Sequence, residues 1–428
     1  MKRSFFPSAS APLRGPELFD ISNRSPFRGP GLLRFALKRP KIDDFSNLTA
    51  FCGNSFTIGI MKIAIDTRET ARTKTGKGWY AFVMVKELIK NDPENQYVLY
   101  TQEKTPEFEK YPNVTQKVFP QKGWLWHWAV LQDLKKNPPD FFWATTSTII
   151  PALTPKSLKT FVTVHDLVAF ILPEGHNRKA MWIERLTLKR ALKKAYRIVT
   201  VSENTKQDLK TRFKINDEKI ILTPCAASNI FIPRIKKSIM ETVTQKYRLP
   251  DRFILGVGTL SPRKNFTRLM KAYERLALTH PEVHLVIVGD WGWCCEEIRK
   301  ESGHPNIHLI GYVEGTDLAA IYNLAEIFVF PSLYEGFGIP PLEAMACGCP
   351  VIVSNNSSLP EVVGEAGLKI DPYSISDITN AMEKILNESA LREKLIEFGF
   401  KQARKFSWKR SAEHLKKEFY SLSKKAVQ

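Results

Sequence analysis

The chain has 428 residues, of which 43% are hydrophobic, and its 63 Lys and Arg against 44 Asp and Glu give a formal net charge of +19. Its length is too great for one ordinary domain of about 150 residues and predicts two, and no run approaches the roughly 18–20 apolar residues of a membrane span. The six cysteines lack C-x-x-C spacing and neighbouring histidines, which argues against a metal site and indicates a reducing compartment. The positive charge favours an anionic partner: a nucleotide, a nucleic acid or an acidic lipid surface.

The first sixty residues differ in composition from the remainder. Six prolines lie among Ser, Arg and Gly with neither helical nor strand periodicity, which predicts a disordered extension over residues 1–60. No apolar h-region precedes a small-residue cleavage site, so a secretory signal is not expected. Met61 starts MKIAIDTR, which looks like the first strand of a complete domain, and a basic targeting arm in residues 1–60 is the alternative.

Residues 61–235 alternate between strand and helix patterns. The apolar run KIAIDT predicts a strand, Gly76 and Gly78 predict a turn, and the residues after them have the spacing of a helix. Further strands are expected in YVLYT, KTFVTVHD and YRIVTVSE, and Ser202 is a candidate N-cap for the helix that follows. A polar, basic stretch from Arg234 to Lys237 marks the predicted end of this first domain.

Residues 236–407 repeat the alternation. Apolar strands are expected in FILGVGT, VHLVIVGD, NIHLIGYV and IFVFPS, with helices over Asn265–Leu278 and Asp317–Leu324. Continuous apolar strands separated by helices indicate parallel sheets covered on both faces. The predicted fold class is therefore α/β, with two Rossmann-like domains that face each other across a cleft.

Most of the candidate site chemistry lies in the stretch VFPSLYEGFGIPPLEAMACGCPVIVSN. Its apolar start predicts a strand, Pro340 and Pro341 can open a helix, and Gly348 can close it. Glu335 then follows a strand and Glu343 falls in the first turn of the helix, so both should face the crevice at the carboxyl ends of parallel strands. The glycines between them let backbone N–H groups approach an anion at the helix start. A sugar nucleotide, with hydroxyl groups at two ends and phosphates between, suits this arrangement.

These motifs resemble glycosyltransferase family 4, whose members are retaining enzymes of the GT-B fold. The resemblance rests on GTLSPRKN, HLVIVG, GYV, the run DLAAIYNLAEIFVFPSLYEGFGIPPLEAMACGCPVIVSN and SLPEVVGEAG, and it extends to TVHDL, VSENTKQDL and FSWKRSAEHL. It implies an acceptor domain over 61–235 and a donor-nucleotide domain over 236–407. It also implies that the last segment, 408–428, forms a helix over about Trp408 to Lys424 that crosses back to the first domain.

The resemblance also assigns roles to single residues. Arg263 and Lys264 would contact the donor phosphates, and Glu343 would bind the ribose hydroxyls. The catalytic candidates are Glu335, beside the transferred sugar, and His165, as a contact of the donor sugar. The remaining members of the donor site are five residues near the diphosphate and two against the nucleobase: Gly76, Gly78, Gly336, Phe337 and Gly338, then Tyr312 and Val313.

Each of these residues also has a structural interpretation. An Arg-Lys pair at a helix entrance is commonly solvated, a lone histidine is commonly a structural hydrogen bonder, and a carboxylate at a helix start contributes roughly a few tenths of a kcal/mol. Glu335 is alternatively a nucleophile, because retention can proceed through a covalent intermediate. The family pattern favours front-face departure assisted by the donor phosphate. We expect substitution of Glu335 or Lys264 to abolish turnover and to leave thermal unfolding nearly unchanged.

Two further stretches bear on the acceptor. Residues 178–197 carry eight Lys or Arg against one acidic residue, Glu184, and place apolar side chains on one helical face. Such a helix can lie on an anionic membrane surface, or it can be an ordinary packed helix with a solvated charged face. Trp124, Trp126 and Trp128 alternate as in a strand, and indicate core packing, an interface or an aromatic acceptor pocket.

The predicted reaction moves a hexosyl group, mannosyl by preference, from a nucleotide diphosphate sugar, with GDP-mannose favoured, to a hydroxyl of a glycan or lipid-linked saccharide. No metal or other cofactor is expected, because cations and helix dipoles can hold the diphosphate. The expected location is the cytoplasm, with peripheral contact at the cytoplasmic membrane face. Alternatives are a sugar-nucleotide epimerase or glycogen-type synthase of the same fold and, more remotely, a basic nucleic-acid-binding protein with steeply salt-dependent binding.

Overall fold

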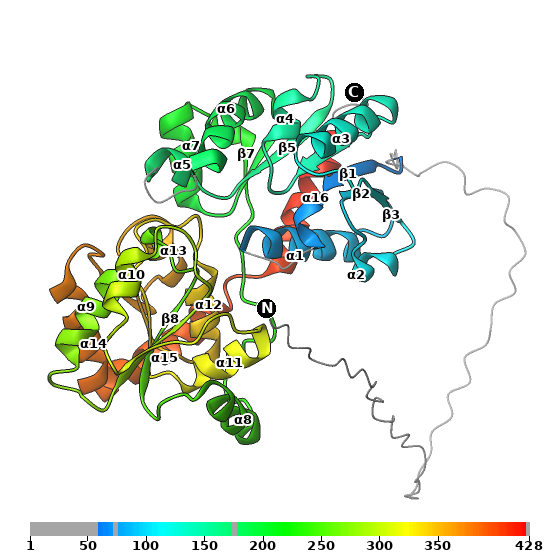
Figure 1. The fold of residues 1–428 in the computed structure, drawn as a ribbon. Coiled ribbons are helices and arrows are strands. Elements are labelled where there is room, and N and C mark those ends of the chain that lie inside the picture. The colour runs from blue at the N-terminus through cyan, green and yellow to red at the C-terminus, as the bar shows by residue number, and fades with distance from the viewer. Residues whose placement is uncertain (1–58, 72–75, 173–177, 425–428) are drawn as a thin grey trace, which may run out of the picture. The chain divides into compact units, whose positions relative to one another are not determined.

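The computed structural model describes residues 59–71, 76–172 and 178–424 (Figure 1). The extension predicted for residues 1–60 therefore lies outside the described residues, apart from Gly59 and Ile60. Within the described ranges the chain forms two parallel sheets, which confirms the α/β fold class predicted from the sequence. No helix in these ranges combines the length and apolar character that crossing a membrane requires.

The first sheet has seven parallel strands in the order β3-β2-β1-β4-β5-β6-β7. Its central strands are buried, as expected when helices cover both faces. The strand order reverses between β1 and β4, so the loops that follow these two strands flank the crevice where such sheets bind ligands. The strands are β1 (Lys62–Asp66), β2 (Gln96–Thr101), β3 (Val114–Val118), β4 (Phe141–Ala144), β5 (Lys159–Val164), β6 (Arg197–Thr200) and β7 (Ile220–Leu222).

Alternate residues of β1 pack against different helices. Ile63 and Ile65 share a core with α1 (Gly76–Lys90) and α16 (Trp408–Lys424), whereas Ala64 shares one with α3 (Trp124–Lys136). The two faces of the sheet are therefore covered by different sets of helices. The other elements of this part are η1 (Arg68–Thr70), α2 (Pro106–Glu109), α4 (Ile149–Leu153), α5 (Val168–Ile171), α6 (Arg178–Lys194), α7 (Glu203–Phe213) and η3 (Asp217–Lys219).

The second sheet has six parallel strands in the order β10-β9-β8-β11-β12-β13. The predicted boundary between domains, at residue 235, falls between the two sheets and stays a prediction. The strands are β8 (Phe253–Val257), β9 (His284–Val288), β10 (Ile307–Leu309), β11 (Ile327–Phe330), β12 (Val351–Ser354) and β13 (Gly367–Ile370). The helical elements are α8 (Lys237–Tyr247), η4 (Pro262–Lys264), α9 (Phe266–Leu276), α10 (Glu296–Glu301), α11 (Gly315–Leu324), α12 (Ile339–Cys347), α13 (Leu359–Val363), α14 (Ile375–Asn387) and α15 (Ser389–Ala403).

The last helix, α16, packs against the first sheet, beside α1 (Figure 1). Phe419 is buried there, with its ring centroid 5.3 Å from that of Phe141 and 4.5 Å from that of Phe161. One residue later, the Tyr420 hydroxyl donates to Asp92 Oδ1 at 2.7 Å. The predicted helix and its return to the first sheet are both confirmed.

Several local signals fold as the sequence predicts. Ser202 is the N-cap of α7, and its hydroxyl accepts the backbone N–H of Thr205. Pro340 and Pro341 lie in the first turn of α12, where a missing N–H costs no helical hydrogen bond. Gly348 ends that helix in the left-handed conformation, with φ of 82°.

Three placements differ from the prediction. Trp124, Trp126 and Trp128 lie on helix α3 and not on a strand, because the run WLWHW is apolar or aromatic at every position and fits either period. Gly76 and Gly78 lie in the first turn of α1 and not in a turn before it. Glu343 is the fifth residue of α12, one position beyond the first turn, so the helix dipole acts on it less strongly than expected.

The return of α16 can be tested at Phe419. Replacing this buried ring by alanine leaves a cavity against β4 and β5, and we expect Phe419→Ala to lower the free energy of unfolding by about 3–5 kcal/mol. Urea denaturation followed by circular dichroism measures the change. Lys417→Ala, at an exposed position on the same helix, is the matched control and should change it by less than about 0.5 kcal/mol. Equal small effects of both variants would show that α16 is not docked.

Candidate functional site

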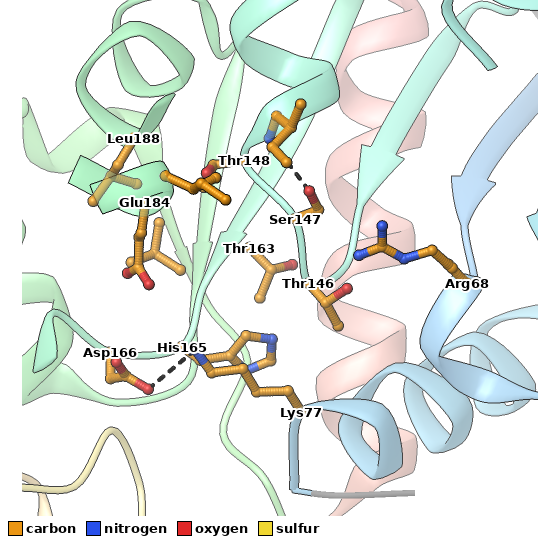
Figure 2. Close-up of a pocket in the computed structure, with 13 residues that line it drawn as sticks. Arg68, Lys77, Thr146, Ser147, Thr148, Thr163, His165, Asp166, Glu184 and Leu188 are labelled. Carbon is orange, nitrogen blue, oxygen red and sulfur yellow. Dashed lines mark hydrogen bonds and ion pairs between the residues drawn. The ribbon is translucent and has the colours of Figure 1, made fainter. Parts of the chain in front are cut away.

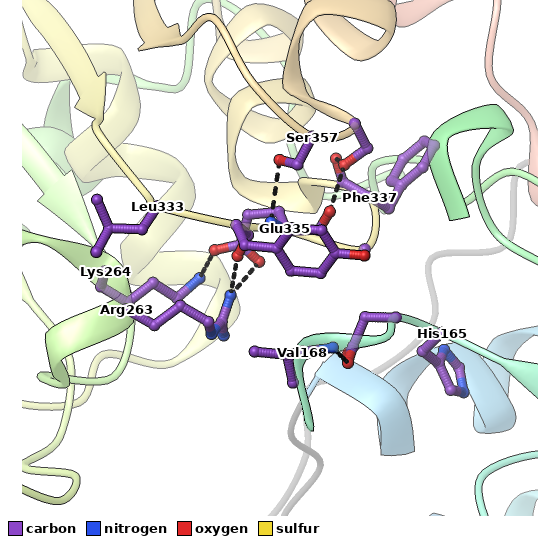
Figure 3. A network of polar contacts seen from close by, with 12 residues as sticks. His165, Val168, Arg263, Lys264, Leu333, Glu335, Phe337 and Ser357 are labelled. Atoms are coloured by element: carbon purple, nitrogen blue, oxygen red, sulfur yellow. Dashed lines mark hydrogen bonds and ion pairs between the residues drawn. The ribbon is translucent and has the colours of Figure 1, made fainter. Parts of the chain in front are cut away.

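A carboxylate is buried between two cations at the carboxyl edge of the second sheet (Figure 3). Glu335 Oε2 lies 2.7 Å from Nη1 of Arg263, and its Oε1 lies 2.6 Å from Nζ of Lys264. The same Arg263 nitrogen also donates to the backbone carbonyl of Tyr334 at 2.7 Å. The structure thus brings together three residues that the sequence analysis assigned to the donor site, although Glu335 is 71 positions from Lys264 in the chain.

The two cations stand on η4, the short helix that follows β8. Asn265 ends η4 with φ of 61°, a left-handed conformation that asparagine tolerates. Its buried side-chain amide donates to the carbonyls of Pro331 and Pro372, at 3.0 and 2.7 Å. The first bond joins η4 to the loop after β11 and the second joins it to the loop after β13, so Asn265 helps to fix the distance between the cations and Glu335.

Two serines hold the loop that carries Glu335. The Ser357 hydroxyl accepts the backbone N–H of Glu335 at 3.1 Å. The Ser358 hydroxyl is close to two carbonyls of the loop, those of Glu335 and Phe337, at 3.0 and 2.6 Å. A Cβ on Gly336 would lie 2.0 Å from the backbone oxygen of His165, so only glycine fits this contact with the first sheet.

The three charges shift one another's protonation. Burial would raise the pKa of Glu335, but Arg263 and Lys264 together lower it to about 2, so this side chain is a carboxylate at neutral pH. Burial lowers the pKa of Lys264, and the positive charge of Arg263 lowers it further. The Glu335 carboxylate compensates only in part, so the pKa is about 8. One anion between two cations leaves an excess positive charge, which is the electrostatic requirement for binding a diphosphate.

The opposing residues come from β5 and the start of α1 (Figure 2). Burial and the charge of Lys77 lower the pKa of His165 to about 4, so its imidazole is neutral. His165 Nε2 lies 2.8 Å from the carbonyl oxygen of Thr145, and because a carbonyl only accepts, this nitrogen carries the hydrogen and Nδ1 is the acceptor. Lys77 Nζ lies 3.4 Å from Asp166 Oδ2. Burial would raise the pKa of Asp166, but Lys77 and Arg263 lower it to about 2.

A pocket of about 270 Å³ opens beside these residues. Its polar lining includes the three consecutive hydroxyl residues after β4, and its wall on the α6 side includes Glu184 and the apolar residues Ile183 and Leu188. Hydroxyl groups and a carboxylate next to apolar side chains match the polar edges and apolar faces of a sugar ring. The three hydroxyl residues are Thr146, Ser147 and Thr148, and the other lining residues are Arg68, Lys77, Ile149, Thr163, Val164, His165 and Asp166.

The remaining predicted residues do not join the charged cluster. Glu343 is partly buried on α12, and its Oε2 accepts the Tyr322 hydroxyl at 3.3 Å. Burial raises the pKa of Glu343 to about 7, although this hydrogen bond opposes the shift. Tyr312 is exposed after β10, whereas Val313 is buried in the core. The ring of Phe337 is also buried, with its centroid 5.5 Å from that of Phe406, so only its backbone faces a ligand.

The predicted glycines differ in what the structure requires of them. A Cβ on Gly78 would lie 2.8 Å from the Glu69 carbonyl oxygen, so this position needs glycine for close packing. Gly76 has open space around its Cα. Gly338 has φ of 113°, which L side chains rarely adopt, at the start of α12.

Sequence reasoning missed several residues of this site. Lys77 lies between the two predicted glycines and Asp166 lies next to His165, so proximity to predicted residues was an available signal for both. Tyr334 is a different case: its hydroxyl donates to Asp208 at 2.7 Å and accepts the Leu167 N–H at 3.4 Å, which joins loops of the two sheets. No local pattern predicts such a pairing. Among the described residues, no group of three or more His, Cys, Asp or Glu side chains is arranged to hold a metal ion.

Comparisons with known proteins match both sheets. The family models described as "Glycosyltransferase Family 4" and "Glycosyl transferases group 1" match residues 75–227 and 241–402. O-antigen chain mannosyltransferase B of Escherichia coli is 35% identical over 287 residues, which cover 66% of this chain and 73% of the relative.

Solved structures share the fold at lower identity. Sucrose-phosphate synthase from Thermosynechococcus elongatus has a TM-score of 0.69 at 19% identity, covering 85% of this chain and 99% of that one. HepE of Anabaena, in complex with UDP-glucose, has a TM-score of 0.68 at 16% identity, covering 84% and 100%. At these identities the similarity shows the GT-B fold alone.

The buried charges of the cluster predict a stability effect that revises the expectation of unchanged unfolding. Glu335→Gln leaves Arg263 and Lys264 without their anion, and we expect it to lower the free energy of unfolding at pH 7 by about 3–5 kcal/mol. The folded pKa of Glu335 is about 2 against an ordinary 4.5, so its contribution is complete above pH 4.5 and disappears as the pH falls toward 2. Urea denaturation at pH 7 and pH 3 measures both values.

Glu343→Gln is the matched control, because the pKa of Glu343 is raised whereas that of Glu335 is lowered. The folded pKa of Glu343 is raised to about 7, so its ionisation opposes folding increasingly from pH 4.5 to 7, and the neutral glutamine should leave stability at pH 8 unchanged or higher. Equal losses in both variants at pH 8 would contradict the charge assignment.

Proposed function

Since the chain belongs to glycosyltransferase family 4, we propose that it transfers a hexosyl group, mannosyl by preference, from a nucleotide diphosphate sugar to a hydroxyl of a glycan or lipid-linked saccharide, with retention. The observation that carries the proposal is the cluster of Arg263, Lys264 and Glu335 next to the loop of His165. The relative named as a mannosyltransferase supports the choice of sugar, and GDP-mannose is the donor we favour.

Donor binding exchanges one anion for another. Arg263 and Lys264 hold the Glu335 carboxylate when no phosphate is near. A diphosphate that reaches these cations competes with Glu335 for them and frees the carboxylate to accept hydrogen bonds from the sugar hydroxyls. The backbone N–H groups from Gly336 to Gly338, at the start of α12, supply further donors to the phosphates. No metal is needed in this scheme.

We propose that Glu335 binds the hydroxyls of the donor sugar and does not act as a nucleophile. Two cations stabilise its negative charge and reduce its nucleophilicity, and the free acid forms only near pH 2. The leaving diphosphate is stabilised by the same two cations, which act where negative charge develops. The acceptor hydroxyl oxygen then bonds to the anomeric carbon on the face from which the diphosphate leaves. The bond from that carbon to the phosphate oxygen breaks, and the hydroxyl proton passes to the departing phosphate. The neutral His165 accepts a hydrogen bond from a hydroxyl of the donor sugar through Nδ1.

The other contacts of the donor follow from the predicted roles. Glu343 is proposed to bind the ribose hydroxyls. Burial raises its pKa to about 7, and hydrogen bonds donated by the ribose would stabilise the ionised carboxylate and lower this pKa again. The backbone of Tyr312 and Val313 is proposed to lie against the base. Residues 61–235 would then form the acceptor domain and 236–407 the donor domain.

The pocket beside His165 is the proposed acceptor site. Thr146, Ser147 and Thr148 present hydroxyl groups, and Glu184 presents a carboxylate. The sugar transfer would take place in the cytoplasm, where peripheral contact with the membrane face brings the enzyme to a lipid-linked acceptor. An epimerase or a glycogen-type synthase of this fold is the alternative, and would give free epimerised sugar or a long homopolymer.

The donor can be identified by ligand-induced stabilisation. We expect GDP-mannose, among GDP-, UDP- and ADP-sugars with and without magnesium, to raise the melting temperature most, because a ligand at 100 times its Kd adds about 2.7 kcal/mol to folded-state stability. Incubation with labelled donor and a glycan acceptor should give a product with retained anomeric configuration. Free epimerised sugar, a homopolymer, or no stabilisation by any nucleotide sugar would refute the proposal.

The lowered pKa of Lys264 predicts that donor affinity depends on pH. Its pKa in the free protein is about 8, and a bound diphosphate raises it, so binding is strongest below pH 8 and weakens by up to about tenfold per pH unit above it. Calorimetric titration with GDP-mannose from pH 7 to 9 measures this, and proton uptake at pH 8.5 is an independent readout. Lys264→Arg, whose charge persists, should flatten the profile. An unchanged affinity between pH 7 and 9 in the natural protein would contradict the assignment.

A further inference from the structure

Two helices on one face of the first sheet carry large apolar side chains that face solvent. On α6, Trp182 is 59% exposed and Leu186 is 73% exposed. On α3, Trp124 and Trp128 are 59% and 54% exposed. Exposure of a tryptophan side chain to water is unfavourable, so an exposed apolar cluster on each of two neighbouring helices requires an explanation.

The exposed residues of α6 form one stripe along the helix. At 100° per residue, Trp182, Leu186, Lys189 and Lys193 fall within a sector of about 60°, and Arg190 lies about 40° beyond it. The opposite side of the helix is buried in the sheet core: Met181, Leu188, Ala191, Leu192 and Ala195. The apolar face that the sequence predicted for this helix is therefore buried. The exposed face carries two more apolar side chains, Trp182 and Leu186, which an ordinary solvated helix face would not have.

Helix α3 repeats this pattern. Trp124, Trp128 and Lys135 fall within about 40° of one another on its exposed side, whereas Trp126 is buried in the core. In both helices the aromatic residues come in the first turns and the lysines in the last. We refer to these two sets of exposed residues as the outer stripes.

The outer stripes belong to the same face of the sheet. Ala64 pairs with Phe142 and Phe142 pairs with Thr160, so these three residues and Val162 point to one side. The core on that side contains α3 next to Ala64 and Phe142, and α6 next to Val162. Helix α4 lies between them and contacts both.

The same face borders the pocket beside His165. Arg68 lines the pocket (Figure 2), and so does Ile183 of α6. Arg68 Nη1 also lies 3.2 Å from Nε2 of His127 on α3. The aromatic halves of both helices therefore stand near the pocket: Trp182 adjoins Ile183, and Trp124 lies one turn before His127.

The charges of the outer stripes are unbalanced. Within the part of the chain that the structure describes, Lys189, Arg190 and Lys193 are exposed and none is paired with a carboxylate. Some exposed lysines elsewhere do have partners: Lys246 pairs with Asp317 at 2.6 Å, for example. A second copy of this chain would bring like charges together, so charge disfavours it as the occupant. An anionic surface fits.

We propose that the outer stripes of α3 and α6 bind the surface of an anionic lipid bilayer, with their tryptophan and leucine side chains in the interfacial region and their lysines at the lipid phosphates. Trp and basic residues together are the combination that interfacial helices use. The pocket beside His165 would then open near the surface that holds a lipid-linked acceptor. Only this last step rests on the proposed function, because the binding of bilayers does not require it.

The charge contribution is tested by sedimentation of the full chain with vesicles of phosphatidylcholine, with and without phosphatidylglycerol. We expect binding to the anionic vesicles only, and a loss of about 25-fold in Lys189→Gln/Lys193→Gln, from roughly fivefold for each cation removed. The control Lys300→Gln/Lys417→Gln removes two exposed cations elsewhere and should change binding by less than about twofold. Equal losses in both double variants, or equal binding to neutral vesicles, would overturn the proposal.

The apolar contribution is tested with matched leucines. Leu186→Ser should weaken binding by tenfold or more, to about a hundredfold, because it removes a large apolar side chain from the interfacial region. Leu278→Ser, at a position that is 85% exposed just after α9, should leave binding unchanged. Trp128→Ser tests α3 separately, and unchanged binding would remove α3 from the surface. A change of oligomeric state in Leu186→Ser, measured by sedimentation velocity, would instead identify a second copy as the occupant.

Stabilisation by GDP-mannose, measured on every variant, separates the two proposals. Normal stabilisation with no vesicle binding in the natural protein would refute the bilayer surface and leave the donor assignment intact. Vesicle binding that depends on the outer stripes, without stabilisation by any nucleotide sugar, would support the surface and refute the proposed function.

Discussion

The Glu335 carboxylate is buried between two cations, and none of these three charges could be buried alone without a large desolvation cost. Mutual compensation therefore fixes where the loops after β8 and β11 lie. Asn265 and the serines after β12 add directed hydrogen bonds, so that the cluster is held by charge and by geometry together. Removing Glu335 leaves two buried cations without an anion, which makes the site and the stability of the second sheet interdependent.

This arrangement also explains how the two cations can lie side by side. Two buried positive side chains repel each other, and without a counter-ion they would move apart or lose a proton. Glu335 supplies the missing negative charge, and a phosphate with comparable hydrogen-bonding geometry can replace it. The cluster carries an excess of one positive charge. Lys77 and Arg263 together lower the pKa of Asp166, which follows β5 of the first sheet.

Local sequence signals predicted local structure well, and long-range contacts were predicted only through resemblance. Ser202, the proline pair of α12 and Gly348 act within one helical turn, so their identities are sufficient to place them. The three tryptophans of α3 failed as a signal because their neighbours are also apolar, which leaves no unique period. The need for glycine at position 336 arises from a carbonyl of His165 that is 171 positions earlier in the chain, and no pattern within the stretch itself reveals it.

The positive charge of the chain has two physically different roles. Arg263 and Lys264 are largely shielded from solvent and act over less than 3 Å, so dissolved salt screens them little. Lys189 and Lys193 are exposed, and their attraction to a charged surface extends over about a Debye length, roughly 8–10 Å at physiological ionic strength. Ionic strength therefore acts on the two separately: salt weakens an encounter with an anionic surface well before it weakens a buried contact with a diphosphate. A composition-level excess of lysine and arginine cannot distinguish these roles, because the distinction lies in burial and not in charge.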